Sequence, residues 1–189
     1  DLIRELQPAV WRDGKDAAGT VLGQVVGAAQ NPGDQIVGVT LLWGDNGVDY
    51  DFGELQRVSI AGHVWSDVIP NCIFEPEEEP IAGVTIHLLD DNGNIVATTL
   101  TDSQGSYKFD DLNPGEYTVR EQQPAGYFQG GQVAGSHGGD DTQVDLIAQV
   151  DLRSGDDAVN YDFCEIPPGQ ISGFVFRDGD AILTTDGVV

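Results

Sequence analysis

Apolar and polar residues alternate along short stretches of this chain, and polar turns separate the stretches. Residues 82–89 (AGVTIHLL) and 94–101 (NIVATTLT) are two of these stretches, with the turn DDNG between them. An Asn-Gly turn flanked by alternating segments is a strong short-range signal for a β-hairpin. The strands SYKF and EYTVREQ follow further turns, and no segment keeps the apolar period of about 3.6 residues that is typical of a helix. The pattern predicts an all-β protein.

A long segment of the chain recurs. Residues 48–67 (VDYDFGELQRVSIAGHVWSD) align without a gap with residues 159–178 (VNYDFCEIPPGQISGFVFRD), an offset of 111 positions, and nine of the twenty residues are identical. Upstream, residues 2–11 (LIRELQPAVW) match residues 118–127 (TVREQQPAGY). The chain is thus a tandem repeat, and such arrays more often extend, display or assemble than catalyse.

The repeat predicts the domain organisation. Residues 1–57 form the C-terminal part of one unit, residues 58–166 a complete unit, and residues 167–189 the start of a following unit. A unit of about 110 residues with about seven strands has the size of an immunoglobulin-like β-sandwich. Alternating aromatic residues are the expected sandwich core; they are Tyr107, Phe109, Tyr117, Tyr161 and Phe163.

The amino-acid composition limits the classes of partner that the chain can bind. The chain has 8 Lys plus Arg against 32 Asp plus Glu, a formal net charge of -24, so it repels nucleic acids and anionic membranes and attracts cations. Apolar residues make up 40% of the chain, which suffices for packed cores and places the acidity on the surface of folded domains. The chain contains no run of about 18 apolar residues, so the sequence predicts no membrane-spanning helix. The chain has no Met and no signal peptide, so we expect a piece of a longer secreted protein.

Residues 83–127 resemble a known family. The elements G-V-x-V-x-L, T-D-x-x-G-x-Y-x-F, L-x-P-G-x-Y-x-V and E-x-x-P-x-G-Y resemble the B-repeat of the serine-aspartate-repeat surface adhesins of Gram-positive bacteria. This SdrD B-like domain is related to the collagen-adhesin B-type and prealbumin-like domains. The resemblance implies a calcium-stiffened, immunoglobulin-like stalk module on a cell surface or in an extracellular assembly. The matching residues are Gly83, Val84, Leu88, Thr101, Asp102, Gly105, Tyr107, Phe109, Leu112, Pro114, Gly115, Tyr117, Val119, Glu121, Pro124, Gly126 and Tyr127.

The resemblance also implies where calcium would bind. In the family, the loop after the first strand of each repeat holds the ion, and Ca²⁺ takes about six to eight oxygen ligands. The complete unit departs from the family pattern, because it keeps the first aspartate of that loop and replaces the later ligands with glutamates. Each acidic cluster is open to two interpretations, a metal site or a solvated surface, and we expect at least one bound Ca²⁺ in the native protein. The candidate ligands are Asp67, Glu75, Glu77, Asp178, Asp180 and Asp186.

The two cysteines permit one internal bridge. Cys72 follows the first strand of the complete unit and Cys164 lies on its last strand, and such strands can be neighbours in this kind of sandwich. The first unit has Gly53 in place of Cys164, so the bridge is not a general feature of the repeat. A disulfide and two free thiols both stay open.

Collagen-adhesin B-type domains often form a Lys-Asn isopeptide bond assisted by a buried acid. The only lysines, Lys15 and Lys108, lie outside the first strand, so this bond is chemically unavailable in its usual place. Glu121 matches the family's buried glutamate, and we expect it to accept backbone hydrogen bonds instead.

Catalytic signatures are missing from the sequence. The three histidines are isolated, no metalloprotease, nucleophile-elbow or phosphate-loop motif occurs, and the adjacent Ser, His and Asp of residues 136–141 do not by themselves make a triad. We therefore expect a non-enzyme. The first hypothesis is an extracellular stalk, fibre or matrix module whose partners are neighbouring repeats or identical subunits in a linear array. The alternative is an adhesive module that binds a glycan or a host protein.

Overall fold

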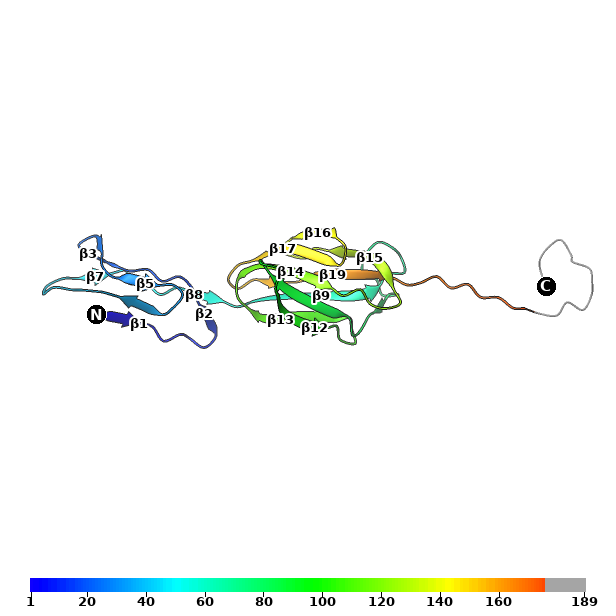
Figure 1. Cartoon of the computed structure of the whole chain (residues 1–189), viewed down its shortest axis with the longest axis horizontal. Coiled ribbons are helices and arrows are strands. Elements are labelled where there is room, and N and C mark those ends of the chain that lie inside the picture. The colour runs from blue at the N-terminus through cyan, green and yellow to red at the C-terminus, as the bar shows by residue number, and fades with distance from the viewer. Residues whose placement is uncertain (176–189) are drawn as a thin grey trace, which may run out of the picture.

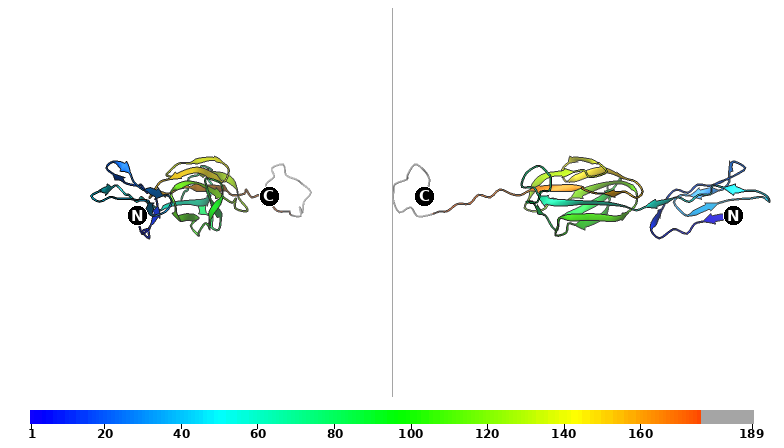
Figure 2. Two further views of the ribbon diagram at one scale, coloured as in Figure 1. Left: turned by 60° about the vertical axis from the view of Figure 1, so that its left-hand side comes forward. Right: turned by 180° about the vertical axis from the view of Figure 1, so that it is seen from behind.

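The computed structural model describes residues 1–175, and these residues form β-strands and turns without a helix. Figure 1 shows a small N-terminal β-region and a larger sandwich arranged end to end, and the two views of Figure 2 show the same elongated arrangement. Within the described part of the chain, no helix is long and apolar enough to cross a membrane. Asp178, Asp180 and Asp186 lie outside the described residues.

The all-β fold predicted from the alternation is confirmed. The first region contains β1 (Leu2–Arg4), β2 (Trp11–Asp13), β3 (Thr20–Val21), β4 (Gln24–Val25), β5 (Ala28–Gln30), β6 (Gln35–Val37), β7 (Gly47–Val48) and β8 (Glu54–Gln56). The sandwich contains β9 (Val58–Ser66), β10 (Glu79–Pro80), β11 (Thr85–Asp90), β12 (Ile95–Leu100), β13 (Ser106–Leu112), β14 (Gly115–Glu121), β15 (Phe128–Val133), β16 (Asp140–Gln143), β17 (Leu146–Leu152), β18 (Asp157–Ala158) and β19 (Asp162–Ile166).

Two sheets face each other in the sandwich. One has the order β10-β9-β19-β15, with β13 and β18 also pairing to β9, and the other has the order β12-β11-β14-β17-β16. The hairpin predicted from the Asn-Gly turn is β11 and β12, in which Leu88 pairs with Ala97. Its turn is held by Asp90, whose Oδ1 accepts the N–H groups of Asn92 at 3.0 Å and Asn94 at 2.8 Å.

The core lies between the two sheets because inward positions of every long strand are apolar. All five aromatic residues predicted for the core are buried. Tyr107 donates its hydroxyl hydrogen to the carbonyl of Tyr161, and Tyr161 donates to the carbonyl of Gly138 at 2.9 Å, so each buried phenol has a partner. The buried cluster comprises Val58, Ile60, Val64, Val84, Ile86, Leu88, Tyr107, Phe109, Tyr117, Val119, Ile147, Val150, Leu152, Ala158, Tyr161 and Phe163.

The sequence repeat is also a repeat of structure. β1 pairs with β6 in the register in which β14 pairs with β17, and β2 pairs with β8 as β15 pairs with β19. The turn at Asp45, whose carboxylate accepts the N–H of Leu42 at 2.6 Å, has its equivalent at Asp156, which accepts the N–H of Arg153 at 2.8 Å. The first region therefore has the pairing of the second half of the sandwich, while the division at residues 57 and 166 stays a prediction.

Replacing Gly62 of β9 with alanine should destabilise the sandwich by about 2 kcal/mol or more, because the added Cβ would clash with a backbone atom and the backbone can shift only at a large cost in free energy. A Cβ at this position would lie 1.9 Å from the carbonyl oxygen of Tyr161. Gly115→Ala is the matched control, since nothing lies within 4 Å of its added Cβ. Urea unfolding of both variants tests this, and equal stability of the two would contradict the packing described for β9.

Candidate functional site

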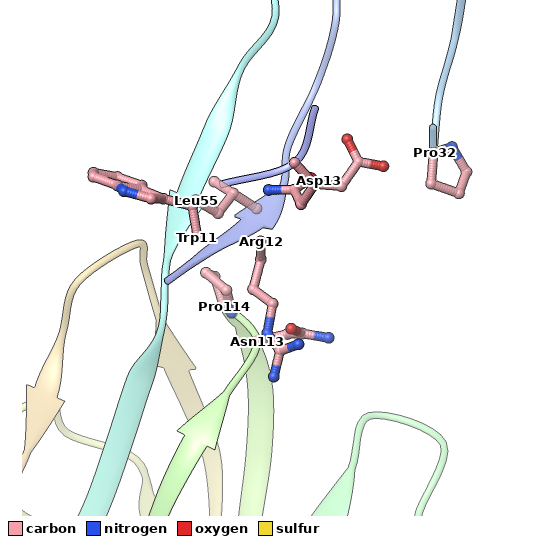
Figure 3. A pocket seen from close by; sticks show the side chains of 8 residues that line it. Trp11, Arg12, Asp13, Pro32, Leu55, Asn113 and Pro114 are labelled. Atoms are coloured by element: carbon pink, nitrogen blue, oxygen red, sulfur yellow. The ribbon is translucent and has the colours of Figure 1, made fainter. Parts of the chain in front are cut away.

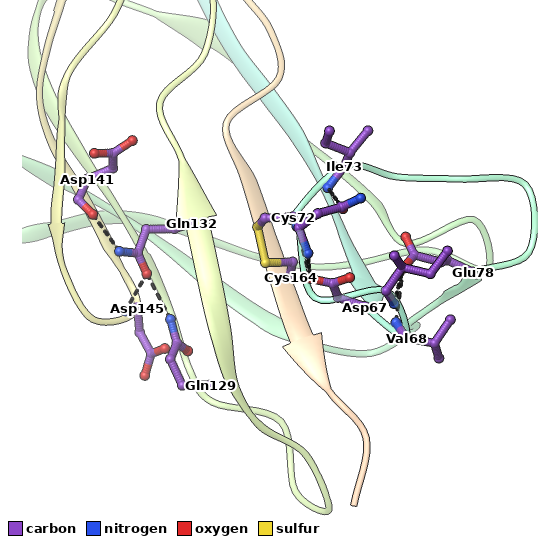
Figure 4. The surroundings of a disulfide bond; sticks show 12 residues. Asp67, Val68, Cys72, Ile73, Glu78, Gln129, Gln132, Asp141, Asp145 and Cys164 are labelled. Atoms are coloured by element: carbon purple, nitrogen blue, oxygen red, sulfur yellow. Dashed lines mark hydrogen bonds between the residues drawn. A yellow bond between two sulfur atoms is a disulfide. The ribbon is translucent and has the colours of Figure 1, made fainter.

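The loop that follows β9 is organised around two buried carboxylates, the first of which is Asp67. Its Oδ2 accepts the N–H groups of Asn71 at 3.1 Å and Cys72 at 2.9 Å. Figure 4 shows this carboxylate beneath the loop, next to the disulfide. One of the predicted calcium ligands thus uses one of its oxygens to fix the loop backbone.

Glu78 is the second carboxylate of the loop. Its Oε1 accepts the N–H groups of Val68 at 2.9 Å and Ile69 at 3.3 Å, and its Oε2 accepts that of Glu75 at 3.2 Å. Burial opposes ionisation of Glu78, but these N–H groups and a side-chain hydrogen bond with Asp67 together outweigh burial and lower its pKa. The side chain is therefore an ionised anchor of the loop, a role that the run of glutamates in the sequence does not reveal.

The predicted loop ligands do not converge. Glu75 is half-buried and its Oε1 accepts a hydrogen bond from Asn71 Nδ2 at 2.8 Å, whereas Glu77 is exposed. In residues 1–175, Asp67, Glu75 and Glu77 do not form a group of three carboxylates close enough to share an ion. Their role as metal ligands stays a prediction.

A disulfide joins this loop to the last strand of the sandwich. Cys72 and Cys164 are bonded, with 5.5 Å between their Cα atoms, so of the two alternatives left open by the sequence the structure has the bridge. Cys164 pairs with Trp65 of β9, and the ring of Phe74 stacks on Trp65 with 5.1 Å between centroids. The bridge and the stacked rings together hold the loop against the end of β9.

A second group of carboxylates lies inside the sandwich. Glu121, Asp145 and Glu165 place carboxylate oxygens within 4.8 Å of one another. The expectation that Glu121 accepts backbone hydrogen bonds is wrong, because no backbone N–H among the described residues reaches its side-chain oxygens, and its side-chain partner is the carboxyl group of Glu165. Its neighbours are the other two acids. We call these three residues the carboxylate cluster.

The cluster is protected from solvent and its charges repel one another. Glu121 is 3% exposed and Glu165 is fully buried. Burial, together with the neighbouring Glu165 and Asp145, raises the pKa of Glu121 to about 9. Burial also raises the pKa of Glu165 to about 7 and raises the pKa of Asp145. These raised pKa values favour the protonated forms of the cluster.

Ser136, His137 and Asp156 form a row of contacts on the surface. Ser136 Oγ lies 2.9 Å from His137 Nδ1, and His137 Nε2 lies 3.5 Å from Asp156 Oδ2. The residue types are those of a hydrolytic triad, but Ser136 Oγ also accepts the N–H of Val159 at 3.0 Å. The row fastens the loop before β16 to the segment before β19, which is a structural role.

The family of the chain follows from the sandwich and from comparison with known proteins. The profile of the SdrD B-like domain matches residues 58–170. The chain belongs to this family. The membership confirms the resemblance found in the sequence and, with it, the extracellular or cell-surface location. The expectation of a non-enzyme stays a prediction.

Several staphylococcal proteins are similar to the chain. Serine-aspartate repeat-containing protein I of Staphylococcus saprophyticus is 42% identical over 82 residues, which are 43% of this chain and 4% of that protein. The fibrinogen-binding protein of Staphylococcus epidermidis is 38% identical over 101 residues, 53% of this chain and 9% of that protein. Serine-aspartate repeat-containing protein D of Staphylococcus aureus (strain Newman) is 31% identical over 140 residues, 71% of this chain and 10% of that protein. The chain thus spans a tenth or less of the length of these relatives.

Among solved structures, the chain is similar to GBS52, the minor pilin of Streptococcus agalactiae. The TM-score is 0.39 with 14% identity, and the similarity covers 69% of this chain and 57% of the pilin chain. The major pilin SpaD of Corynebacterium diphtheriae has a TM-score of 0.37 with 17% identity, covering 59% of this chain and 32% of that chain.

In the presence of a chelator, the free energy of unfolding should fall as the pH rises from about 5 to about 9. An acid whose pKa is raised by folding stabilises the protein fully below its unfolded pKa, and this contribution is lost as the pH passes the folded pKa. For Glu121 the window runs from 4.5 to about 9, and at about 1.4 kcal/mol per pKa unit the loss across it is at most about 6 kcal/mol. Denaturant unfolding at several pH values measures this. Glu121→Gln should flatten the profile, and a flat profile for the unmodified chain would contradict the prediction.

Proposed function

We propose that the chain is a rigid stalk segment of a long extracellular protein, and that calcium stiffens it. The observation that carries this proposal is the junction between the two units. Only Arg57 separates β8 from β9, so the backbone passes from one unit to the next in a single residue. A junction that short leaves little chain to bend.

Polar contacts fasten one side of the junction. Asp111, near the C-terminal end of β13, contacts both Arg57 and Arg12, and the Arg12 Nη2 to Asp111 Oδ2 distance is 3.3 Å. Arg12 Nη2 also donates to the carbonyl oxygen of Asp111 at 3.2 Å. One carboxylate of the sandwich thus binds one arginine from β2 of the preceding unit and one from the junction itself.

The opposite side of the junction has its own contact. The N–H of Gln56 donates to Ser154 Oγ at 2.7 Å, and Gly155 leaves room for the Gln56 side chain, because a Cβ there would lie 2.4 Å from Gln56 Oε1. Between the units is a pocket of about 490 Å³. Figure 3 shows Arg12 reaching from the first unit toward Asn113 and Pro114 of the sandwich. Contacts on two sides restrict bending in more than one direction.

The charge of the chain supports the part played by calcium. A net charge of -24 on 189 residues makes neighbouring units repel each other, and a bound divalent cation reduces that repulsion. Partners in this proposal are neighbouring repeats or identical subunits in a linear assembly.

An adhesive role is the second candidate, and exposed apolar side chains favour it. Leu42 and Trp43 of the first unit are largely or fully exposed. However, the equivalent turn of the sandwich places Ser154 where the first unit has Trp43, and Ser154 contacts the preceding unit through Gln56. Trp43 therefore occupies a junction position, which favours contact with another unit of the stalk over capture of a host ligand.

Asp111→Asn should loosen the junction while leaving the sandwich folded. Exposed ion pairs contribute about 0 to 1 kcal/mol each, so the melting temperature should change by little. The maximum dimension from small-angle X-ray scattering should become smaller as bent conformations are populated. Asp110→Asn is the matched control, because Asp110 pairs with Lys108 and not with the junction arginines. Identical scattering of both variants and the unmodified chain would show that Asp111 does not stiffen the junction.

Calcium should raise the melting temperature and extend the scattering envelope relative to a chelator-treated sample, since it neutralises repelling carboxylates. The magnesium salt at equal ionic strength controls for screening. An unchanged melt and an unchanged envelope would remove calcium from the proposal. Saturable binding of fibrinogen or a glycan array to the chain, abolished by Trp43→Ser, would favour the adhesive function.

A further inference from the structure

The carboxylate cluster connects the two sheets of the sandwich. Glu121 is the last residue of β14 and Asp145 immediately precedes β17, and these two strands are neighbours in one sheet. Glu165 lies on β19 in the other sheet. The N–H of Glu121 donates to the carbonyl oxygen of Asp145 at 3.0 Å, which fixes the backbones of these two acids relative to each other. Any ligand held by all three carboxylates would link one sheet to the other.

Four carboxylate oxygens of the cluster are buried and receive no hydrogen bond from a group outside the cluster. They are both side-chain oxygens of Glu121, Oε1 of Glu165 and Oδ1 of Asp145. In the described part of the chain, no lysine or arginine forms an ion pair with any of the three. The amide of Gln123 donates to Glu165 Oε2. Buried carboxylates are costly unless they are paired, protonated or bound to a metal, so this arrangement lacks a positive partner.

Acids and a glutamine recur in the first unit at the positions equivalent by the sequence repeat, although among the described residues only the sandwich brings the three carboxylates within 4.8 Å of one another. There Glu5, Asp34 and Glu54 take the places of the three acids, and the N–H of Glu5 donates to the carbonyl oxygen of Asp34 at 3.1 Å. Gln7 takes the place of Gln123 and donates to Glu54 Oε2 at 2.5 Å. These residues are partly exposed, because within residues 1–175 no strand equivalent to β9 covers them. Because these like-charged residues occur in both units, a shared ligand explains them better than chance does.

We propose that Glu121, Asp145 and Glu165 form a divalent-cation site, with Ca²⁺ as the cation that fits its donors. The donors are oxygens only, which suits hard cations, and zinc sites usually include nitrogen or sulfur. A set of three carboxylates suits the irregular, oxygen-rich coordination of Ca²⁺ better than that of Mg²⁺, which demands a strict octahedron and usually keeps several waters. The ion compensates the buried charges and holds β14 and β17 to β19.

This inference does not depend on the loop ligands. Asp67, Glu75 and Glu77 lie in the loop after β9, whereas the cluster lies within the sandwich. The cluster is a second location for the proposed calcium stiffening. Calcium can therefore bind at the cluster without binding in the loop, or bind in the loop without binding at the cluster. Proton binding and cation binding compete at the cluster, so calcium should bind more tightly as the pH rises from about 6 to about 8.

The test uses the full chain, stripped with a chelator and titrated with CaCl₂ by calorimetry at pH 8, with parallel thermal melts. The double variant Glu121→Gln/Glu165→Gln should bind calcium at the sandwich at least 10-fold more weakly and lose most of the calcium-induced rise in melting temperature. Without calcium, the same variant should melt higher than the unmodified chain, because it removes the repulsion. A variant that merely misfolds would melt lower.

Two matched variants separate the cluster from other acids. Glu116→Gln changes an exposed acid on the same strand and should leave binding unchanged, and Glu75→Gln/Glu77→Gln tests the loop. Loss of all calcium binding in the loop variant, with full binding in the cluster variant, would overturn the inference. So would an infrared spectrum in which protonated carboxyl bands of the unmodified chain persist at saturating calcium, since the cluster would then hold protons instead of metal.

Discussion

The structure depends on the double pairing of β9. This strand pairs antiparallel with β13 and parallel with β19, so it occupies the inside of its sheet and its side chains are buried at most positions. The parallel pairing with β19 connects the beginning of the unit to its end. It sets Cys164 beside Trp65, so that the loop after β9 can reach Cys164 through Cys72. The disulfide is thus a consequence of this strand pairing, and Glu165, the next residue of β19, is fully buried.

Gly62 allows β9 to approach the backbone that leads into β19. Its missing side chain lets the backbone of β9 approach the carbonyl oxygen of Tyr161, which in turn accepts the hydroxyl of Tyr107. A glycine inside a strand is usually unfavourable, so its presence here marks a close approach of two backbones. Gly62 of β9 and Tyr107 of β13 therefore both meet the carbonyl group of Tyr161, although the two residues are far apart in sequence.

The fold could be predicted from the sequence because its signals are local. The Asn-Gly turn determines the hairpin of β11 and β12, and alternation identifies core residues such as Tyr107 and Phe163. The site could not be predicted in the same way. The resemblance assigns Asp67 to calcium, which stays a prediction, whereas its hydrogen bonds to backbone N–H groups depend on loop conformation and leave no pattern in the sequence. Glu121 was recognised as buried, but its neighbours come from strands that only the tertiary fold brings together.

Comparison of the two units distinguishes the features that both repeats share from the features found in one unit only. The carboxylate set and its glutamine occur in both units, so they are a property of the repeating sandwich. The disulfide occurs in one unit, since Gly53 stands in the place of Cys164, and Trp43 stands in the place of Ser154. These differences lie at the ends of the sandwich, where a unit meets its loop or its neighbour. In a linear array the ends experience different partners while equivalent positions along the units do not, so acids retained at equivalent positions of both units agree with the proposal of a ligand that each unit binds for itself.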